Sequence, residues 1–486
     1  MSAGTTAAML LSQCSRNVPR EETSVAPSAP VQFQKIVSSN GLLSLDLEAK
    51  LQRVRLGGIN ANLLSYNEQV PGPLLEASPG DRVQIRFTNR LTQPTNIHFH
   101  GLHISPEIDN VFLEIAPGEQ HTYEFQIPEN HPAGTFWYHP HKHGLVAEQL
   151  FGGLAGLFIV RGALDKLPEI KTAQESFLVL KDFALDRSGN IADTGHMAAM
   201  TGRAGGLLTT SGQMNPAMPI KKGGLARLRL LNASPSRFFR LSLEDHSMHL
   251  IATDGGAIAS PVELSEVVLA PGERAEVLVQ GNQTPRNYRL INQPFNPAQG
   301  DTMGGMMGIM RSTDGSDTVA TLVYQEEAGE GETNEISIPS ELTTVESLPE
   351  PNITRQFALN HGMGGGGMMG GGMMGGSMVF LINGKAFDPS RIDTQVKLDT
   401  VEDWEVTNTG SMAHPFHIHT NKFQIISQNG QRVPYAAWKD VVSVSPGETV
   451  RIRMAFRDYT GKTVYHCHVL DHEDRGMMGI VEIQQA

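Results

Sequence analysis

The chain has 486 residues, which is too long for one ordinary hydrophobic core and favours about three domains. Its 38 Lys and Arg against 51 Asp and Glu give a formal net charge of −13 with no basic run, which argues against nucleic acid or an anionic membrane surface as a partner. Frequent glycine and proline between short alternating segments favour an all-β fold, and the sequence contains no stretch of 18 apolar residues that would predict a transmembrane helix.

Residues 1–30 allow two interpretations. The segment 7–14 resembles the end of a lipoprotein export signal, in which Cys14 would carry the lipid. However, no Lys or Arg precedes Arg16, and the apolar run is short for a signal peptide. The alternative is a disordered leader, which the Ser, Pro, Glu and Thr content of residues 15–30 would suit.

Two sequence motifs repeat through the rest of the chain, each three times and in the same order. An alternating strand closed by asparagine occurs at residues 82–89, 226–232 and 403–408. An Ala/Ser-Pro-Gly-Glu turn that leads into another strand follows at residues 116–119, 270–273 and 445–448. We infer three homologous β-sandwich domains, at 31–162, 163–326 and 351–486, with residues 327–350 as a linker.

Histidine pairs fall on this repeat unevenly. The chain contains four His-x-His pairs, and because side chains alternate along a strand, both members of each pair should share one face. The pairs are His98 with His100, His139 with His141, His417 with His419, and His466 with His468. Two pairs belong to the first predicted domain and two to the third, so we expect them to meet at the interface of these domains. Eight neutral imidazoles suit copper better than magnesium, calcium or manganese.

A second ligand set shares the last of these strands. Cys467 lies between His466 and His468 and should point to the opposite face, together with His414, which is an odd number of residues from His417. With His472 and a more distant Met477, this is the His2Cys and Met set of a blue-copper site. A disulfide with Cys14, the other cysteine, would remove this thiolate, so we predict none.

These motifs resemble those of the three-domain multicopper oxidases. The chain has, in order, His-x-His-Gly, His-x-His, His-Pro-x-His-x-His and His-Cys-His-x3-His-x4-Met. The resemblance implies three cupredoxin-like Greek-key β-sandwich domains and four copper ions, namely one type 1, one type 2 and two type 3. The implied ligands are His414, Cys467, His472 and Met477 for type 1; His98 and His417 for type 2; and His100, His139, His141, His419, His466 and His468 for type 3. The implied reaction is one-electron oxidation of a substrate at type 1 and reduction of O2 to water at the other three coppers.

Two acids match residues through which related oxidases move protons. Asp109 follows the first histidine pair, and Glu473 is next to His472. A buried carboxyl group near a metal site can hold or transfer a proton. We therefore predict a proton relay through both, the alternative being two ordinary surface or helix-end acids.

Many of the 21 methionines cluster in glycine-rich segments, which cannot form a core. Since thioethers favour Cu(I), these residues are candidate ligands for cuprous substrate, although a flexible loop would also tolerate them. One tract spans residues 303–310, and the second, at 363–378, is where cuprous oxidases carry a methionine-rich insert. Gly410 departs from that branch, which has aspartate there. The candidates are Met303, Met306, Met307, Met310, Met363, Met368, Met369, Met373, Met374, Met378 and Met412.

The sequence therefore predicts a copper enzyme with O2 as one substrate and Cu(I), or a small phenol or aromatic amine, as the other. The first hypothesis is a cuprous oxidase with a role in copper tolerance, and the second is a laccase proper. A copper-free structural member of the family is a third, which the complete ligand set opposes. A two-domain nitrite reductase relative is opposed by the three repeats. We expect an extracytoplasmic monomer.

Overall fold

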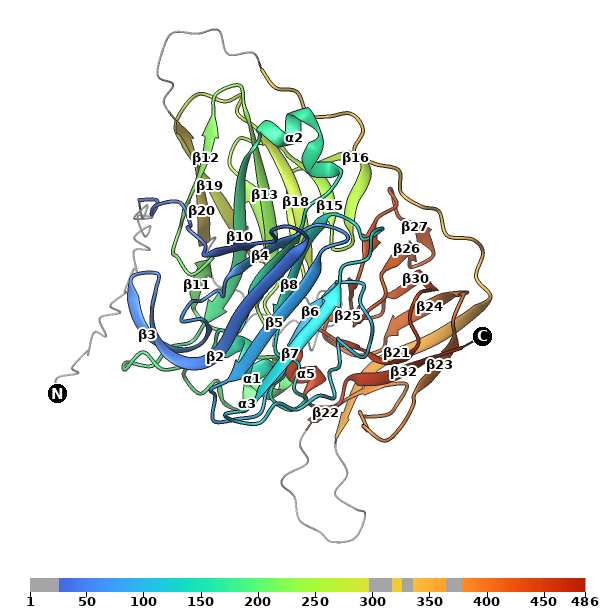
Figure 1. Cartoon of the computed structure of the whole chain (residues 1–486). Helices are drawn as coiled ribbons and strands as arrows, with labels where there is room; N and C mark the ends of the chain where they lie inside the picture. The colour runs from blue at the N-terminus through green and yellow to red at the C-terminus, as the bar shows by residue number, and fades with distance from the viewer. Residues whose placement is uncertain (1–25, 297–316, 326–334, 364–377, 486) are drawn as a thin grey trace, which may run out of the picture.

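The computed structural model describes residues 26–296, 317–325, 335–363 and 378–485. Strands dominate these residues and fall into three units, each a sandwich of two sheets (Figure 1). The predicted all-β class is thus confirmed. The strands of the units lie within residues 35–160, 174–325 and 353–484, while the predicted domain boundaries stay predictions. Cys14, the 303–310 methionines and those at 368–374 lie outside the described residues.

The N-terminal unit pairs a sheet of order β1-β4-β9-β8-β6 with one of order β3-β2-β5-β7. Its core lies between the sheets, because alternate residues of strands such as β5 are apolar and buried. The strands are β1 (Lys35–Val37), β2 (Leu42–Leu56), β3 (Ile59–Tyr66), β4 (Leu74–Ala77), β5 (Arg82–Asn89), β6 (His98–His100), β7 (Gln120–Gln126), β8 (Gly134–His139) and β9 (Gly156–Val160).

The middle unit has sheets of order β11-β10-β13-β18-β15-β16 and β12-β20-β19-β14-β17. All residues of β13 are buried, since this strand lies between its own core and the N-terminal unit. The strands are β10 (Gln174–Phe183), β11 (Leu207–Thr210), β12 (Ala217–Lys221), β13 (Leu225–Asn232), β14 (Phe239–Leu243), β15 (Met248–Thr253), β16 (Gly256–Leu264), β17 (Val267–Leu269), β18 (Arg274–Gln280), β19 (Asn287–Gln293) and β20 (Asp317–Gln325).

The C-terminal unit has one sheet of order β22-β21-β24-β30-β26-β27, with β28 paired to β26, and a second of order β23-β32-β31-β25-β29. The strands are β21 (Ile353–Met363), β22 (Met378–Ile382), β23 (Thr394–Lys397), β24 (Thr400–Asn408), β25 (His414–Ile418), β26 (Phe423–Gln428), β27 (Gln431–Arg432), β28 (Trp438–Lys439), β29 (Val441–Val444), β30 (Thr449–Phe456), β31 (Gly461–Cys467) and β32 (Met478–Gln484).

Helices are short and connect the strands. They are α1 (Val146–Gly152), α2 (Pro168–Thr172), α3 (Gly195–Thr201), α5 (Leu470–Glu473) and the 3-10 turn Leu164–Lys166. Within the described part of the chain, no helix has both the length and the apolar character needed to span a membrane.

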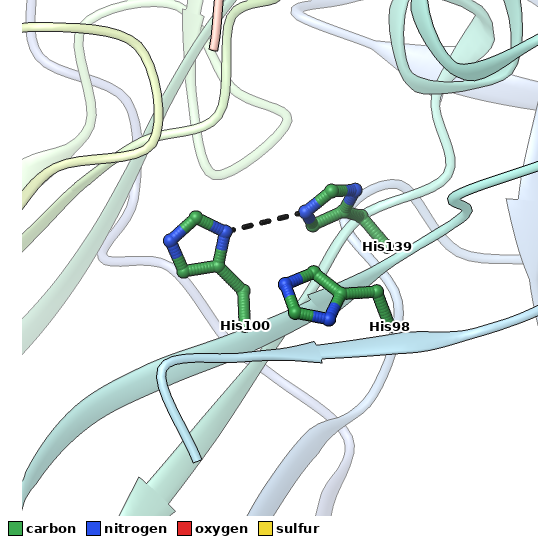
Figure 2. A group of neighbouring side chains, drawn as sticks. All are labelled: His98, His100 and His139. Carbon is green, nitrogen blue, oxygen red and sulfur yellow. Dashed lines mark hydrogen bonds between the residues drawn. The ribbon is translucent and has the colours of Figure 1, made fainter. Parts of the chain in front are cut away.

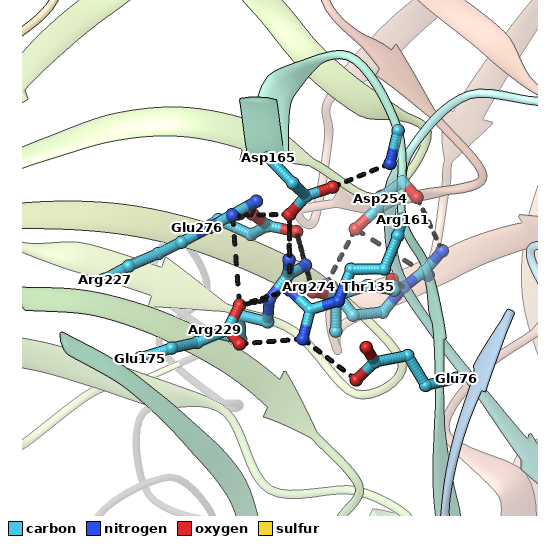
Figure 3. Close-up of polar contacts among 11 residues, drawn as sticks. Glu76, Thr135, Arg161, Asp165, Glu175, Arg227, Arg229, Asp254, Arg274 and Glu276 are labelled. Carbon is cyan, nitrogen blue, oxygen red and sulfur yellow. Dashed lines mark hydrogen bonds and ion pairs between the residues drawn. The ribbon is translucent and has the colours of Figure 1, made fainter. Parts of the chain in front are cut away.

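Buried charges join the N-terminal and middle units (Figure 3). The fully buried guanidinium of Arg229 on β13 donates to Glu276 at 2.5 Å, to Glu175 at 2.6 Å and to Thr135 of β8 at 3.0 Å. Because removing one member of a buried ion pair costs about 3–5 kcal/mol, such contacts hold the two units in one arrangement.

Candidate metal centres

Four strands carry the histidine pairs to one place. In the N-terminal unit, β6 pairs with β8 so that His98 lies opposite His139. In the C-terminal unit, β25 pairs with β31 so that His417 lies opposite His466. The strands β6 and β25 lie side by side (Figure 1), and all eight imidazoles of the four pairs are buried between these units. Figure 2 shows three of the four imidazoles that the N-terminal unit supplies.

Two groups of imidazole nitrogens are each close enough together to bind one metal ion. His98 Nε2 lies 3.4 Å from His417 Nε2. His466 Nε2 lies 3.1 Å from the Nε2 atoms of both His141 and His419. Two imidazole nitrogens on one tetrahedral ion, each with a bond of about 2.0 Å, would be separated by roughly 3.3 Å. The spacing therefore fits one ion in each group, with every ion held from both units.

A third group contains the remaining imidazoles. His100 Nδ1 lies 3.4 Å from His139 Nε2 (Figure 2), and the ring centre of His468 lies 5.1 Å from that of His100. Both nitrogens of His468 are buried without a hydrogen-bond partner. A buried polar atom without a partner is costly, and a metal ion at this point would satisfy one of them.

Asp109 joins the two units beside these groups. Its carboxylate oxygens lie 2.8 and 2.9 Å from His98 Nδ1, and one of them lies 3.1 Å from His419 Nδ1. The backbone N–H of Phe99 donates to the same carboxylate at 3.0 Å. Asp109 thus accepts a hydrogen bond from one imidazole of each unit, which directs the Nε2 atoms of both toward the metal positions.

Asp440 is a site residue that our sequence analysis missed. Its Oδ1 lies 3.0 Å from His100 Nε2, and its backbone carbonyl accepts from His417 Nδ1 at 2.8 Å. It comes directly before β29, which pairs with β25 so that Val441 lies opposite His417. Only this long-range pairing brings Asp440 to the site, and no local motif marks it.

Glu473 lies between one imidazole of the N-terminal unit and one of the C-terminal unit. Its Oε2 is 3.2 Å from His466 Nδ1 and its Oε1 is 3.5 Å from His141 Nε2, but neither oxygen is aligned for a hydrogen bond. Burial, and then the neighbouring Asp474, raises the pKa of Glu473 well above its usual value. Burial therefore favours the protonated form of this side chain, next to an imidazole of each unit.

The imidazoles themselves are neutral at neutral pH. Burial is the main cause that lowers the pKa of each, to about 4 for His466 and well below 6.5 for the others, and neighbouring imidazoles lower several further. Neutral imidazole is the form that binds metal, so the copper-free site does not have to release protons before binding.

A separate site lies on the other face of β31. Cys467 Sγ lies 3.4 Å from His414 Nδ1 and 3.8 Å from His472 Nδ1, and these two nitrogens are 3.3 Å apart. Met477 is fully buried, and its carbonyl accepts from the backbone N–H of Cys467 at 3.0 Å. Burial raises the pKa of Cys467, so without metal it is a thiol. One sulfur and two nitrogens at these spacings fit a single soft metal ion.

The outer side of His472 is covered. The ring of Phe380 on β22 stacks on it at 3.8 Å and 17°. The carbonyl of Met200 in α3 lies 3.2 Å from His472 Nε2. Arg203, just after α3, holds Asp471 through a bidentate contact at 2.9 and 3.1 Å, which fixes this segment over α5. The imidazole of His472 is therefore buried beneath Phe380 and the segment around α3.

His414 is equally buried, but its neighbours differ from those of His472. A methyl group placed on Gly410 would lie 3.3 Å from His361 Nδ1 and 3.5 Å from His414 Nε2, and both nitrogens are buried without a hydrogen-bond partner. Met412 is half-buried and packs against the core of this unit. The strands on either side of the second methionine tract pair so that Met363 lies opposite Met378, close in sequence to Phe380.

Comparisons with known proteins agree with this geometry. Three family models, each described as multicopper oxidase, match residues 49–164, 173–327 and 358–486. A solved multicopper oxidase from Campylobacter jejuni, described as a metallo-oxidase, is 31% identical with a TM-score of 0.81, over 95% of this chain and 96% of that one. The multicopper oxidase mco of Staphylococcus haemolyticus is 29% identical over 92% of this chain and 89% of its own. The cell division protein FtsP of Proteus mirabilis is 28% identical over 89% of this chain and 86% of its own.

Proposed function

The chain belongs to the multicopper oxidase family, and from this premise we propose that it oxidises Cu(I) at the Cys467 site and reduces O2 to water at the eight-histidine site. In this proposal, His98 and His417 hold a type 2 copper, while His141, His419 and His466 hold one type 3 copper and His100, His139 and His468 the other. His414, Cys467 and His472 would hold a type 1 copper, with Met477 as a further, weak ligand. Copper, when bound, supplies the one-electron chemistry and the binding of O2.

The protein contributes a connection between the sites and a supply of protons. Cys467 is covalently joined to His466 and His468, which belong to the two different type 3 groups, so electrons have a short route along β31. Glu473 holds a proton between His141 and His466, and Asp109 accepts hydrogen bonds from His98 and His419. We assign Glu473 as the proton donor to reduced oxygen, and Asp109 as the group that orients imidazoles and helps to replace that proton.

The observation that carries the choice of Cu(I) is the contrast between the two histidines of the Cys467 site. Phe380 and α3 cover His472, whereas Nε2 of His414 and Nδ1 of His361 lie on either side of Gly410 without a hydrogen-bond partner, and Met412 comes two residues before His414 in the sequence. An imidazole nitrogen and a thioether are ligands for a cuprous ion. The cuprous oxidases have an aspartate at the position of Gly410, and we propose that His361 takes its place as a ligand for Cu(I). We further propose that the methionines of residues 363–378 deliver Cu(I) to this point.

The proposal places the protein outside the cytoplasm with a role in copper tolerance. Oxidation of Cu(I) by O2 would protect a compartment that is exposed to external copper. A lipid anchor at Cys14 is part of this proposal and concerns residues outside those described. A monomer suffices, since one chain supplies every ligand. The relative named FtsP raises the alternative of a structural protein, but all ten histidines, the cysteine and the methionine are present here.

Oxygen uptake by copper-loaded protein tests the choice of substrate. Wild type, a deletion of residues 363–378, and Met412→Leu and His361→Gln variants would each receive Cu(I) or a simple phenol. Met214→Leu is the control, because Met214 is exposed in the middle unit. We expect the three changes near His414 to raise the KM for Cu(I) about tenfold or more, with phenol oxidation retained. Faster turnover of phenol than of Cu(I) in wild type, unaffected by the deletion, would identify a laccase instead.

A further inference from the structure

The eight imidazoles are not oriented alike. Five of them place Nδ1 near a protein oxygen, which fixes the hydrogen on Nδ1 and leaves the Nε2 lone pair for metal. These are His98 and His419 on Asp109, His139 on the carbonyl of Pro140, His417 on the carbonyl of Asp440, and His466 on the carbonyl of Cys467. His141 and His468 have no such partner on Nδ1.

His100 is the reverse of these five. Its Nε2 contacts Asp440 Oδ1 at 3.0 Å, and its Nδ1 faces His139 Nε2 at 3.4 Å. To bind an ion together with His139, His100 must therefore carry its hydrogen on Nε2 and present Nδ1. A carboxylate is an acceptor only, so Asp440 selects this tautomer.

Asp440 is itself fixed by the middle unit. Arg274, the first residue of β18, donates to its two oxygens at 2.7 and 2.5 Å. The same guanidinium donates to the carbonyls of Thr135 at 3.1 Å and Asp254 at 2.9 Å (Figure 3). It also donates to the carbonyl of Gly272 at 3.0 Å, and both Gly272 and Asp254 belong to the middle unit. Its exposure is 0%. Every donor direction is thus used, and Asp440 has both oxygens turned toward Arg274 and one shared with His100.

We propose that Arg274 and Asp440 are a positioning pair that fixes the tautomer of His100, so that the middle unit, which supplies no imidazole to the site within its described residues, determines how one copper ligand binds. This inference rests on the proposed copper cluster. It gives a functional reason for this buried charge pair. Stability alone does not require the pair, because a protein in which apolar residues of similar volume replace a buried ion pair is often as stable.

Asp440→Asn is the direct test. An asparagine offers one oxygen, which the two Arg274 donors would take, so its amide N–H would face His100 and require the opposite tautomer. We expect the variant to bind less copper than wild type, or to lose the magnetic coupling of the type 3 pair, seen as an added paramagnetic copper signal. The visible absorption of the Cys467 site should remain, because no residue of that site contacts Asp440 in the described contacts.

Asp254→Asn is the matched control. Asp254 is equally buried in the same charge group, where it accepts from the backbone N–H of Arg274 at 2.8 Å and from Lys439 at 2.9 Å, but it contacts no imidazole. A merely structural role predicts similar losses of thermal stability and of copper in both variants. The positioning role predicts that only Asp440→Asn changes the copper count or the coupling.

Arg274→Lys gives a second measurement, because lysine keeps the charge without the two parallel donors. We expect an intermediate loss of coupling, which also tests the pair should Asp440→Asn fail to fold. Unchanged coupling in both variants, or equal loss in Asp254→Asn, would overturn the inference. Wild type that binds no coupled copper pair would instead contradict the proposed function itself.

Discussion

The eight-histidine site and the Cys467 site share strand β31 but are built in opposite ways. The first lies between two units, takes four imidazoles from each, and has Asp109, Asp440 and Glu473 around it. The second takes its ligands from the C-terminal unit alone and has apolar groups such as Phe380 packed against it. Assembly of the units therefore creates one site, and local folding creates the other.

This difference follows the two tasks in the proposed reaction. Reduction of O2 consumes protons, so titratable groups belong beside the cluster. Transfer of one electron at the Cys467 site consumes no proton. Apolar surroundings exclude water there and help to keep the ligand geometry the same in both redox states. The sites should accordingly fail independently when single residues are changed.

Cys467→Ser should have the largest effect, because it removes the thiolate that joins the sites. We expect complete loss of the intense visible absorption and of substrate oxidation, while the imidazole cluster still binds copper. Copper content and paramagnetic resonance would measure this. Loss of all copper from the variant would show that the Cys467 site is needed to assemble the cluster, contrary to the comparison above.

Glu473→Gln keeps the size of the side chain and removes its proton supply. General acid catalysis contributes about 100- to 10,000-fold, so O2 reduction should slow by a factor in this range. Rapid mixing of fully reduced enzyme with O2 separates this step from substrate oxidation. Substrate should still reduce the copper of the Cys467 site, and so bleach its blue absorption, at the wild-type rate. An unchanged rate of reoxidation would remove Glu473 from the proton path.

Asp109→Asn should have a smaller effect, since an amide oxygen can still accept from one of the two imidazoles. Loss of a partner that orients metal ligands typically costs about 10- to 100-fold in metal affinity or activity. We expect slower O2 reduction with the blue absorption retained, and weaker retention of copper against a chelator. Loss of the blue absorption would mean that Asp109 affects the other site.

Acid should destabilise the copper-free protein. Its buried imidazoles, among them His414 with a pKa lowered to about 3, stay neutral where the unfolded chain takes up protons below pH about 6.5. The unfolded state then binds more protons, so stability falls as the pH drops from 6.5 toward 4, by about 1.4 kcal/mol per pH unit for each fully shifted group. The raised pKa of Glu473 acts in the opposite direction, but it is one group against many. Urea midpoints across this range would measure the slope, and a flat profile would contradict it.

The sequence predicted the all-β class and the family because both depend on short-range patterns. Strand alternation placed the histidine pairs on one face of each strand, and the turn at 445–448 marked a repeat that recurs in all three units. The candidate ligands Met368 and Met373 show the limit of such patterns, since composition suggests a chemistry without placing the atoms.

What the sequence did not reveal depends on contacts between distant segments. Asp440 and Arg274 are 166 residues apart; Asp440 directly precedes β29, Arg274 begins β18, and the two meet where the C-terminal and middle units contact each other. Likewise, the cover of His472 by α3 joins residues 272 apart. No spacing rule predicts such contacts, because they depend on how whole units dock. The imidazoles were predictable as a set, and the family resemblance set His98 and His417 apart from the other six, whereas the division of those six into two groups required coordinates.

The smallest effect is expected from a glycine of the middle unit that lies against the eight-histidine site. The repeated Pro-Gly-Glu turns place Gly118 and Gly272 at similar positive φ, +85° and +87°. A methyl group on Gly118 would meet nothing within 4 Å, whereas one on Gly272 would lie 2.9 Å from Nε2 of His468. Both alanine variants should lose about 1–2 kcal/mol from the left-handed backbone. Only Gly272→Ala should also displace His468 and alter the type 3 copper signal, and the same signal in both variants would show that the middle unit does not constrain this imidazole.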